Sequence, residues 1–278
     1  MIHVRLMTRC DLPLGMRLKE QAGWNQTEAD WLRQLDLEPA GCFVAEWDGI
    51  ARGTACTCVF GSVAWIATLL VDEPFRRRGI GTALLKHALE YLDRRAIRTV
   101  RLDATPLGQS LYERLGFVPQ FPLARFEGVL PPSPAMDGVR SLRPEEAMDI
   151  LGFDQRVTAT ERGKLLIRLV MERPETLRAV HQSGRLAGFL MSRPGACATQ
   201  IGPCLAEPAA GALLLADAWH RYAGQRVYVD IPTQNTLAMA VAQAHGLTIQ
   251  RQLLRMCRGP AVVEDVSRLW ASFGPEKG

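Results

Sequence analysis

The sequence has no apolar run that could cross a membrane, because none approaches the roughly 20 apolar residues that a spanning helix needs. Residues 1–13 lack the apolar core and the cleavage site of a signal peptide. The net charge of +4 is small and the arginines are spread along the chain, which argues against nucleic-acid binding. We therefore expect a cytoplasmic protein with no membrane and no nucleic-acid partner.

Cysteine pairs with the spacing of a metal or redox site are missing as well. None of the seven cysteines belongs to a C-x-x-C pair, and an odd number suits a reducing compartment. We expect reduced, mostly buried thiols and no bound metal. The cysteines are Cys10, Cys42, Cys56, Cys58, Cys197, Cys204 and Cys257.

The chain does have the length and the apolar content for one large domain or two ordinary ones. Its 278 residues are 47% hydrophobic and 22% charged, which is typical of a soluble protein with a core. The stretch 128–138 contains three prolines and two glycines and has the composition of a linker. We predict domains at 1–129 and 139–278, joined by a linker at 130–138.

Strand and helix patterns alternate through the first domain, which predicts an α/β (α+β) fold. Asp48-Gly49 between two strand-like runs is a hairpin signal, and Gly116 has the position of a glycine that ends a helix. We expect strands at 3–7, 42–47, 51–60, 63–71, 98–103 and 117–127, and helices at 11–22, from 27 to before Pro39, at 82–95 and at 108–115.

A similar order of elements returns after the linker, which indicates one plan used twice. Segment 105–117 aligns without gaps on 235–247, and this places Gly116 on Gly246. We expect strands at 139–142, 176–181, 185–192, 226–231 and 247–257, and helices at 144–153, 161–172, 209–222, 236–245 and 262–273.

The most distinctive segment runs from residue 63 to residue 95. A strand-like run is followed by the turn signal Asp72-Glu73-Pro74, a basic loop with two glycines at 76–81, and a helix. The loop lacks the third glycine of the dinucleotide-binding pattern and the Gly-Lys-Ser/Thr of a P-loop. Free amides at a helix start attract an oxyanion, and glycine lets it approach. The loop is therefore either an anion site or a solvated turn that caps a helix.

A second motif lies downstream, Leu111-Tyr112-Glu113-Arg114-Leu115-Gly116-Phe117. Together with the Arg-x-x-Gly-x-Gly loop at 76–81, in this order and with a strand between, it resembles the GNAT N-acetyltransferase family. The resemblance implies a tandem form with two GNAT-like domains, each a mixed, twisted central sheet flanked by helices. It also implies that acyl-CoA lies in a wedge where two neighbouring strands separate.

The resemblance assigns roles to residues of the first domain. Tyr112 would protonate the departing thiolate, as a neutral phenol can do, or its ring would only pack on the cofactor. The family often has asparagine seven residues earlier, where this chain has Thr105, so a bond to the cofactor arm is lost or is made by the threonine hydroxyl. The implied cofactor contacts are Leu69, Val71, Arg76, Arg77, Arg78, Gly79, Ile80, Gly81, Thr82 and Thr105.

The sequence contains fewer features that point to the acceptor site. In GNAT-like folds the connection between the first two helices lines the acceptor pocket, so Trp24 and Asn25 are candidates for substrate contact. The alternatives are a core tryptophan and a capping asparagine, and Trp31 is expected in the core. Glu46 and Asp103 are the candidates for a general base.

The second domain lacks both motifs. Glu207 and Pro208 stand where arginine and glycine would be needed, and Ala242 stands in place of the tyrosine, although Asn235 occupies the asparagine position. We predict that this domain is a degenerate copy, that one cofactor binds per chain, and that the protein is a monomer or a homodimer.

These observations lead to one functional hypothesis and two alternatives. The hypothesis is an acyl-CoA-dependent N-acyltransferase that moves an acetyl group from acetyl-CoA to a primary amine of a small molecule, by direct attack in a ternary complex. One alternative is a protein or peptide N-acetyltransferase. The other is an acyl-CoA-binding sensor without turnover.

Overall fold

The computed structural model describes residues 1–143 and 146–278. The first half of the chain alternates strands and helices in the order that the pattern predicts. Its elements are β1 (Ile2–Leu6), α1 (Leu12–Gln21), α2 (Glu28–Leu37), β2 (Cys42–Trp47), β3 (Ile50–Phe60), β4 (Val63–Val71), α3 (Ile80–Arg94), β5 (Thr99–Ala104), α4 (Pro106–Arg114) and β6 (Val118–Val129).

The second half repeats this order. Its elements are β7 (Val139–Ser141), α5 (Ala147–Thr158), α6 (Gly163–Glu172), β8 (Arg178–Gln182), β9 (Arg185–Arg193), β10 (Thr199–Ala206), α7 (Pro208–Arg221), β11 (Arg226–Pro232), α8 (Thr236–Ala244), β12 (Thr248–Arg258) and β13 (Leu269–Ala271). None of the helices in the described part of the chain is long and apolar enough to span a membrane.

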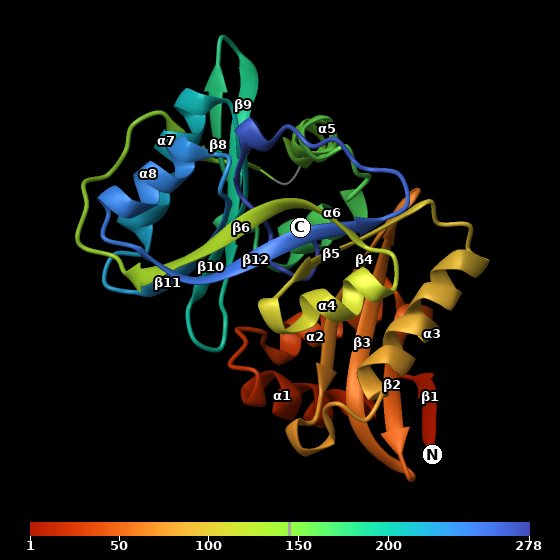
Figure 1. Cartoon of the computed structure of the whole chain (residues 1–278). Coiled ribbons are helices and arrows are strands. Elements are labelled where there is room, and N and C mark those ends of the chain that lie inside the picture. Colours follow the sequence, from red (N-terminus) through yellow and green to blue (C-terminus); the bar gives the residue numbers. More distant parts are fainter. Residues whose placement is uncertain (144–145) are drawn as a thin grey trace.

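The strands form one mixed, twisted sheet with helices on its faces (Figure 1). The strand order is β1-β2-β3-β4-β5-β12-β6-β11-β10-β9-β8-β7, and β13 pairs with β10 outside this path. Each of the strands β1 to β6 has a counterpart among β7 to β12, in the same sequence order. With this correspondence, the strand order counted from the β1 edge is the same as the order counted from the β7 edge. The repeat is therefore present in the topology, as predicted.

The centre of the sheet is built by an exchange of strands. β12, from the second half, pairs with β5, and β6, from the first half, pairs with β11. β6 and β12 also pair with each other, antiparallel, along Thr248–Cys257. The predicted limits 1–129 and 139–278 therefore divide the sequence into its two repeats. In the fold, one sheet continues from the first repeat into the second, with no free strand edge between them in the described part of the chain.

Helices cover the two faces of the sheet according to the alternation of apolar residues. In β2, Phe43 and Ala45 pack against α3, whereas Cys42 and Val44 pack under α1 and α2. The predicted core residue Trp31 is fully buried on the α1 and α2 side. In the second half, α7 and α8 cover one core and α5 and α6 cover the other.

The predicted helix at 262–273 is wrong. This segment contains a short 3-10 turn at Val266–Arg268 and then β13. Leu269 and Ala271 lie opposite Leu205 and Cys204 of β10, and the ring of Trp270 packs so tightly on Gly211 of α7 that a Cβ there would overlap it. Long-range pairing decides the structure of this segment, which a local pattern cannot show. The predicted helix at 144–153 begins outside the described residues, and α5 starts at Ala147.

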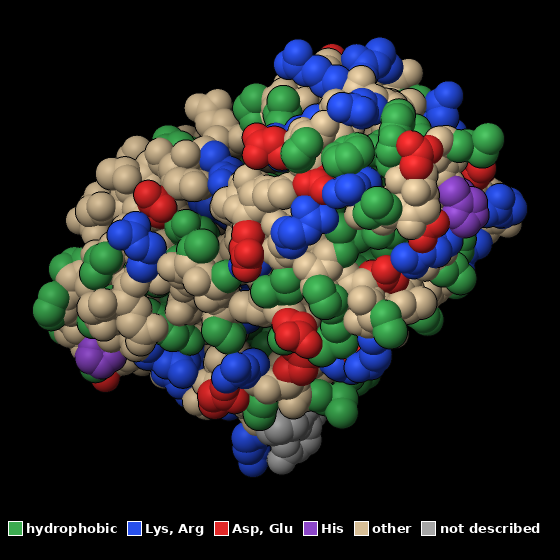
Figure 2. Space-filling view, turned by 90° about the horizontal axis from the view of Figure 1, so that it is seen from below, with side chains coloured by type: hydrophobic (Ala, Val, Ile, Leu, Met, Phe, Trp, Pro, Cys, Tyr) green, Lys and Arg blue, Asp and Glu red, His purple; other side chains and the backbone are tan. Residues whose placement is uncertain are grey.

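Charged groups are distributed unevenly over the surface. Figure 2 shows the end of the molecule that lies at the bottom of Figure 1, where basic side chains gather along one edge of the view. Over the rest of this face, acidic, basic and hydrophobic side chains are mixed.

Candidate functional site

A wedge opens between β4 and β5. The two strands pair in parallel at only three positions, the last of which is Trp65 opposite Arg101, although β4 continues to Val71 and β5 to Ala104. Beyond these pairs, the facing backbone edges of the two strands have no ladder partner in the part of the chain that the structure describes. Leu69 and Val71, two predicted cofactor contacts, lie on this separated part of β4.

A β-bulge lies on β4 within the wedge. Thr68 has a left-handed backbone with φ of 48°, and the register with β3 shifts there. The bulge changes the alternation of side chains, so that Ile66 and Leu69 both belong to the α3 side while Leu70 packs under α1. The Thr54 hydroxyl donates to the Thr68 carbonyl at 2.8 Å, which fixes the bulge.

The loop at the end of β4 presents free backbone donors. Among the residues that the structure describes, the N–H groups of 77–82 donate no backbone hydrogen bond, and the first bond of α3 runs from Ala83 N to Gly79 O at 2.9 Å. Arg77 and Gly79 have positive φ of 61° and 87°. A row of free N–H groups at a helix start binds an oxyanion such as phosphate.

Arginine side chains border this row of donors. Arg77 and Arg78 are exposed, and the Arg78 guanidinium lies 5.2 Å from the centre of the Phe75 ring. Arg76 instead points back along the chain, where its Nε donates to the Val71 carbonyl at 3.3 Å. Two arginine charges are thus available to an anion at the loop.

The end of β4, the start of α3 and α4 converge at the mouth of the wedge. A Cβ placed on Gly81 would lie 3.6 Å from Val71 and 3.7 Å from Leu111. Thr105 precedes α4 as its N-cap residue, and its side chain makes no capping hydrogen bond. The structure therefore brings the predicted loop, Thr105 and the helix that carries Tyr112 to one place.

Tyr112 is half-buried on the α3 side, next to Phe117, with ring centres 5.9 Å apart. Burial raises the pKa of its phenol to about 12. The phenol is therefore neutral over the physiological pH range. Its hydroxyl has no hydrogen-bond partner among the described residues, which leaves its proton free for an incoming group.

The two candidate bases are both engaged in ion pairs. Asp103 receives two hydrogen bonds from Arg255, at 2.8 and 2.9 Å, in a fully buried site, and burial raises the pKa of its carboxyl. Glu46 lies on β2, two strands away from β4, and accepts from Arg5 at 2.6 Å. That bond lowers the pKa of Glu46.

The connection between α1 and α2 contacts the second half of the chain. The Asn25 amide oxygen accepts from the N–H groups of Cys197 and Ala198, and its NH₂ group donates to the Ala198 carbonyl at 2.9 Å. Asn25 is therefore buried and bonded to the loop after β9. Trp24 is half-buried and packs against the core under α1 and α2.

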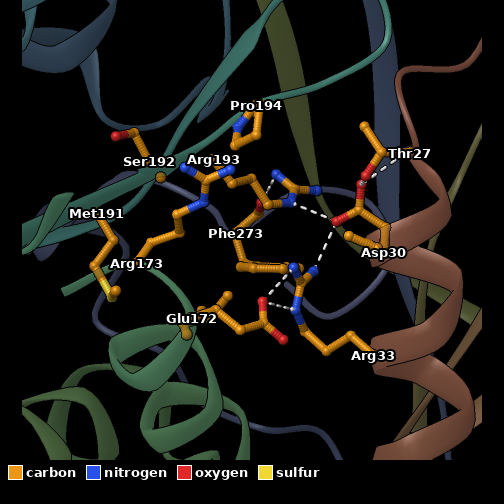
Figure 3. Close-up of a pocket in the computed structure, with 13 residues that line it drawn as sticks. Thr27, Asp30, Arg33, Glu172, Arg173, Met191, Ser192, Arg193, Pro194 and Phe273 are labelled. Atoms are coloured by element: carbon orange, nitrogen blue, oxygen red, sulfur yellow. Dashed lines mark hydrogen bonds and ion pairs between the residues drawn. The ribbon is translucent and has the colours of Figure 1, made fainter. Parts of the chain in front are cut away.

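A cavity of about 250 Å³ lies between the two halves (Figure 3). Asp30 and Arg33 reach it from α2, Glu172 from the end of α6, and Arg193 from the end of β9. Arg33 donates to Asp30 at 2.7 Å and to Glu172 at 2.7 Å. Burial would raise the pKa of Asp30, but Arg193 and Arg33 hold it well below its ordinary value.

These cavity residues were missed by sequence reasoning. Asp30 and Arg33 form an i, i+3 pair that looks like ordinary helix surface, and nothing near Arg193 in the sequence marks it as buried. These side chains meet only because α2 lies next to β9 and α6 in the folded chain.

The second half contains a corresponding wedge that is filled by the chain itself. β10 and β11 pair in parallel only from Thr199 to Ile201. β13 then pairs with β10, and Ser272 N donates to the Asp230 carbonyl of β11 at 2.8 Å. Asn235 donates to the carbonyls of Ser267 and Leu269, and so holds β13 in place.

The start of α7 also differs from the start of α3. Glu207 alone separates β10 from α7, its N–H donates to Ala187 O at 2.8 Å, and Pro208 has no N–H.

No group of three or more His, Cys, Asp or Glu side chains within 1–143 and 146–278 could hold a metal ion.

Comparisons with known proteins point to one family for both halves. Residues 13–117 match the acetyltransferase (GNAT) family and residues 150–271 match an acetyltransferase (GNAT) domain family. The uncharacterized N-acetyltransferase YitH of Bacillus subtilis is 25% identical over 228 residues, which are 80% of this chain and 79% of that protein.

Two further relatives extend the comparison. The ribosomal protein bS18-alanine N-acetyltransferase of Escherichia coli is 33% identical over 73 residues, 25% of this chain and 49% of that protein. A crystal structure from Pyrococcus horikoshii has a TM-score of 0.86 at 23% identity, and the match covers 100% of this chain and 96% of that one. At that identity, the last likeness concerns the fold.

Proposed function

Because the chain belongs to the GNAT family and is an acetyltransferase, we propose that it transfers an acetyl group from acetyl-CoA to a primary amine of a small molecule. The observation that carries this proposal is the row of free N–H groups at 77–82, next to a wedge between β4 and β5. A pyrophosphate needs such donors, and an extended thioester arm needs unpaired strand edges.

The residues at the first wedge suit acetyl-CoA as co-substrate. Gly79, Ile80, Gly81 and Thr82 would offer backbone N–H groups to the pyrophosphate, with charge from Arg77 and Arg78. Arg76 would instead act by fixing the end of β4. Leu69 and Val71 would bond the pantetheine arm through their backbones, and the side chain of Thr105, which makes no capping hydrogen bond, is available to it.

The proposed reaction is direct. The neutral amine nitrogen forms a bond to the thioester carbonyl carbon, the carbon–sulfur bond breaks, and the Tyr112 phenol gives its proton to the leaving sulfur. The proton that the amine nitrogen loses passes to water, and water returns a proton to the Tyr112 phenolate. A pKa of about 12 keeps this proton in place until negative charge develops on the sulfur.

Trp24, Asn25, Glu46 and Asp103 remain candidates for substrate contact. Asp103 and Glu46 would have to leave their arginine partners before either could act as a base. The cavity beside Asp30 and Arg33 has about 250 Å³, a size that supports a small acceptor.

We further propose one CoA site per chain. The filled wedge between β10 and β11 and the missing loop before α7 support a second half without cofactor. Because β6 and β12 already pair inside one chain, a monomer is the simpler assembly, with a homodimer as the alternative. The free cysteines support a cytoplasmic location.

The second candidate function is acetylation of a protein or peptide amine. It is supported by the Escherichia coli relative, whose name gives a ribosomal protein as its acceptor. Release of CoA from acetyl-CoA, measured with a panel of small primary amines and separately with peptides that have free N-termini, distinguishes the two. A sensor without turnover would release CoA with neither.

Tyr112→Phe tests the proposed mechanism. Since phenylalanine cannot donate a proton, we expect kcat to fall about 100-fold, with little change in the KM for acetyl-CoA. Tyr228→Phe is the matched control, because this hydroxyl belongs to β11 of the second half and makes no hydrogen bond among the described residues. Activity of Tyr112→Phe equal to wild type at every pH would exclude the acid role.

A further inference from the structure

The segment after β13, residues 273–278, forms part of the wall between the two halves. Phe273 lines the cavity beside Asp30 and Arg193, and the Arg193 guanidinium lies 4.3 Å from the centre of its ring (Figure 3). Gly274 O accepts from the N–H groups of Lys277 and Gly278, at 3.3 and 3.2 Å, so the segment is a compact turn.

Charged side chains of this turn are buried. The exposed fraction is 4% for Glu276 and 2% for Lys277. Glu276 accepts from Arg193 at 3.3 Å and from Gln26, while Arg162 donates to the backbone oxygens of Lys277 and Gly278. The turn is therefore held by polar groups of both halves.

The turn reaches the base of the first wedge. Gly278 packs directly on the ring of Trp65, the last residue of β4 that pairs with β5. Burial raises the pKa of the Cys58 thiol, and the Lys277 ammonium lowers it. Cys58 lies opposite Trp65 of β4. An amine of the chain itself thus lies on the α1 and α2 side of β4, where the strand begins to leave β5.

This arrangement would destabilise the fold if the only role of the turn were to fill space in the core. Burial lowers the pKa of Lys277. Its ammonium lies 5.9 Å from the centre of the Phe273 ring and makes no ion pair or hydrogen bond with any of the described residues. A buried charge with only an aromatic ring beside it destabilises its site, and an apolar residue of similar size would fill the space better. The turn places the Glu276 carboxylate against Arg193 and the Lys277 amine beside the wedge. An acceptor with a carboxylate and a primary amine would place the same two groups there.

We propose that residues 273–278 occupy the acceptor site and leave it when the acceptor binds. The acceptor is then a primary amine that carries a carboxylate, with Arg193 and Gln26 as its carboxylate partners in place of Glu276. This inference rests on the proposed function for its chemistry, but the position of the turn can be tested without any acetyl transfer.

The test measures access to Cys58, which is 3% exposed and belongs to the same buried cluster as Phe273 of the turn. The full-length protein is treated with methyl methanethiosulfonate, and the labelled cysteines are mapped by mass spectrometry over time. Cys204, buried in the core of the second half, is the internal control for unfolding. Wild type is compared with Lys277→Met and Glu276→Gln.

We expect the two variants to change labelling in opposite directions. Lys277→Met removes the buried charge, so the turn stays seated and Cys58 reacts about tenfold more slowly. Because Lys277 also lowers the pKa of Cys58, the rates are compared per thiolate, from the pH dependence of labelling in each protein. Glu276→Gln weakens the bond to Arg193, so Cys58 reacts about tenfold faster. Labelling of Cys204 stays at the wild-type rate in both. Equal rates at Cys58 in all three proteins would overturn the proposal, whatever the enzyme acetylates.

Turnover tests the acceptor class separately. 4-Aminobutyrate is compared with butylamine, and β-alanine with propylamine, by CoA release. We expect the carboxylate-bearing member of each pair to have a kcat/KM at least about tenfold higher, since a charge-assisted bond to arginine is lost in the other. Equal values within both pairs would overturn this acceptor class, and no release with any amine or peptide would instead count against the proposed function.

Discussion

The two wedges of the molecule are built alike and end differently. In each, two parallel strands pair for three residues and then separate, β4 from β5 and β10 from β11. The first wedge remains lined by unpaired strand edges and is followed by a loop with free N–H groups. The second is closed by β13, and a single residue, Glu207, leads into α7.

The difference shows that unpaired strand edges need an occupant. Buried backbone groups without hydrogen bonds are unfavourable, so the edges of a wedge must be bonded by water, a ligand or a piece of chain. In the second half, Asn235 holds the carbonyl of Leu269 in β13. We propose that Thr105, at the matching position of the first half, faces a ligand instead.

The loop glycine of the first wedge should give the largest effect. In Gly79→Val, a β-branched residue cannot keep φ near 87°, so the N–H groups around it turn away. We expect CoA affinity, measured by calorimetry, to fall about 100-fold. This change corresponds to the loss of two charge-assisted hydrogen bonds.

The control for this variant is Gly246→Val, which strains a glycine with φ of 80° after α8 in the second half. CoA affinity should stay at the wild-type value there. Two CoA molecules per chain, or normal affinity in Gly79→Val, would contradict a single site at the first wedge.

Loosening the filled wedge should give the next largest effect. Asn235→Ala removes the bonds to Ser267 and Leu269 and the helix cap on Ala238. We expect the free energy of unfolding to fall by about 2 kcal/mol in urea denaturation. Thr105→Ala, at the matching cap without a side-chain bond, should change it by less than about 0.5 kcal/mol. Similar losses in both would mean that the two wedges are held in the same way.

The smallest effect concerns the acid that follows each wedge strand. Asp72 accepts from Arg17 and Arg52, at 2.9 Å each, whereas Glu207 makes an exposed pair with Arg268. Although burial opposes it, these bonds lower the pKa of Asp72 to about 2. A lowered pKa stabilises the fold above the ordinary value near 4, and this contribution is lost as the pH falls toward 2.

We therefore expect Asp72→Asn to lower the free energy of unfolding by about 1 to 2 kcal/mol at pH 7, with the difference from wild type shrinking to zero as the pH falls below 2. Glu207→Gln should lie within about 0.5 kcal/mol of wild type at both pH values. A loss in Asp72→Asn that does not depend on pH would show that packing, and not charge, holds the end of β4.

Local sequence patterns were sufficient for most of the elements. The hairpin at Asp48-Gly49, the helix stop at Gly116 and the loop at 76–81 depend on turn chemistry that acts within a few residues. The helix predicted at 262–273 failed because pairing with β10 outweighs local preference. Gly211, inside a helix of alanine and leucine, was the one available sign that another element, Trp270, approaches there.

The sequence by itself determined the repeat, the basic glycine loop and the helix that carries Tyr112, because each depends on the order of nearby residues. Only the tertiary structure decided that β6 and β12 change places, that β13 closes the second wedge, and that residues 273–278 lie beneath the first. These are contacts between segments far apart in the chain. Their free energy comes from surfaces and hydrogen-bonding groups that exist only after both partners have folded.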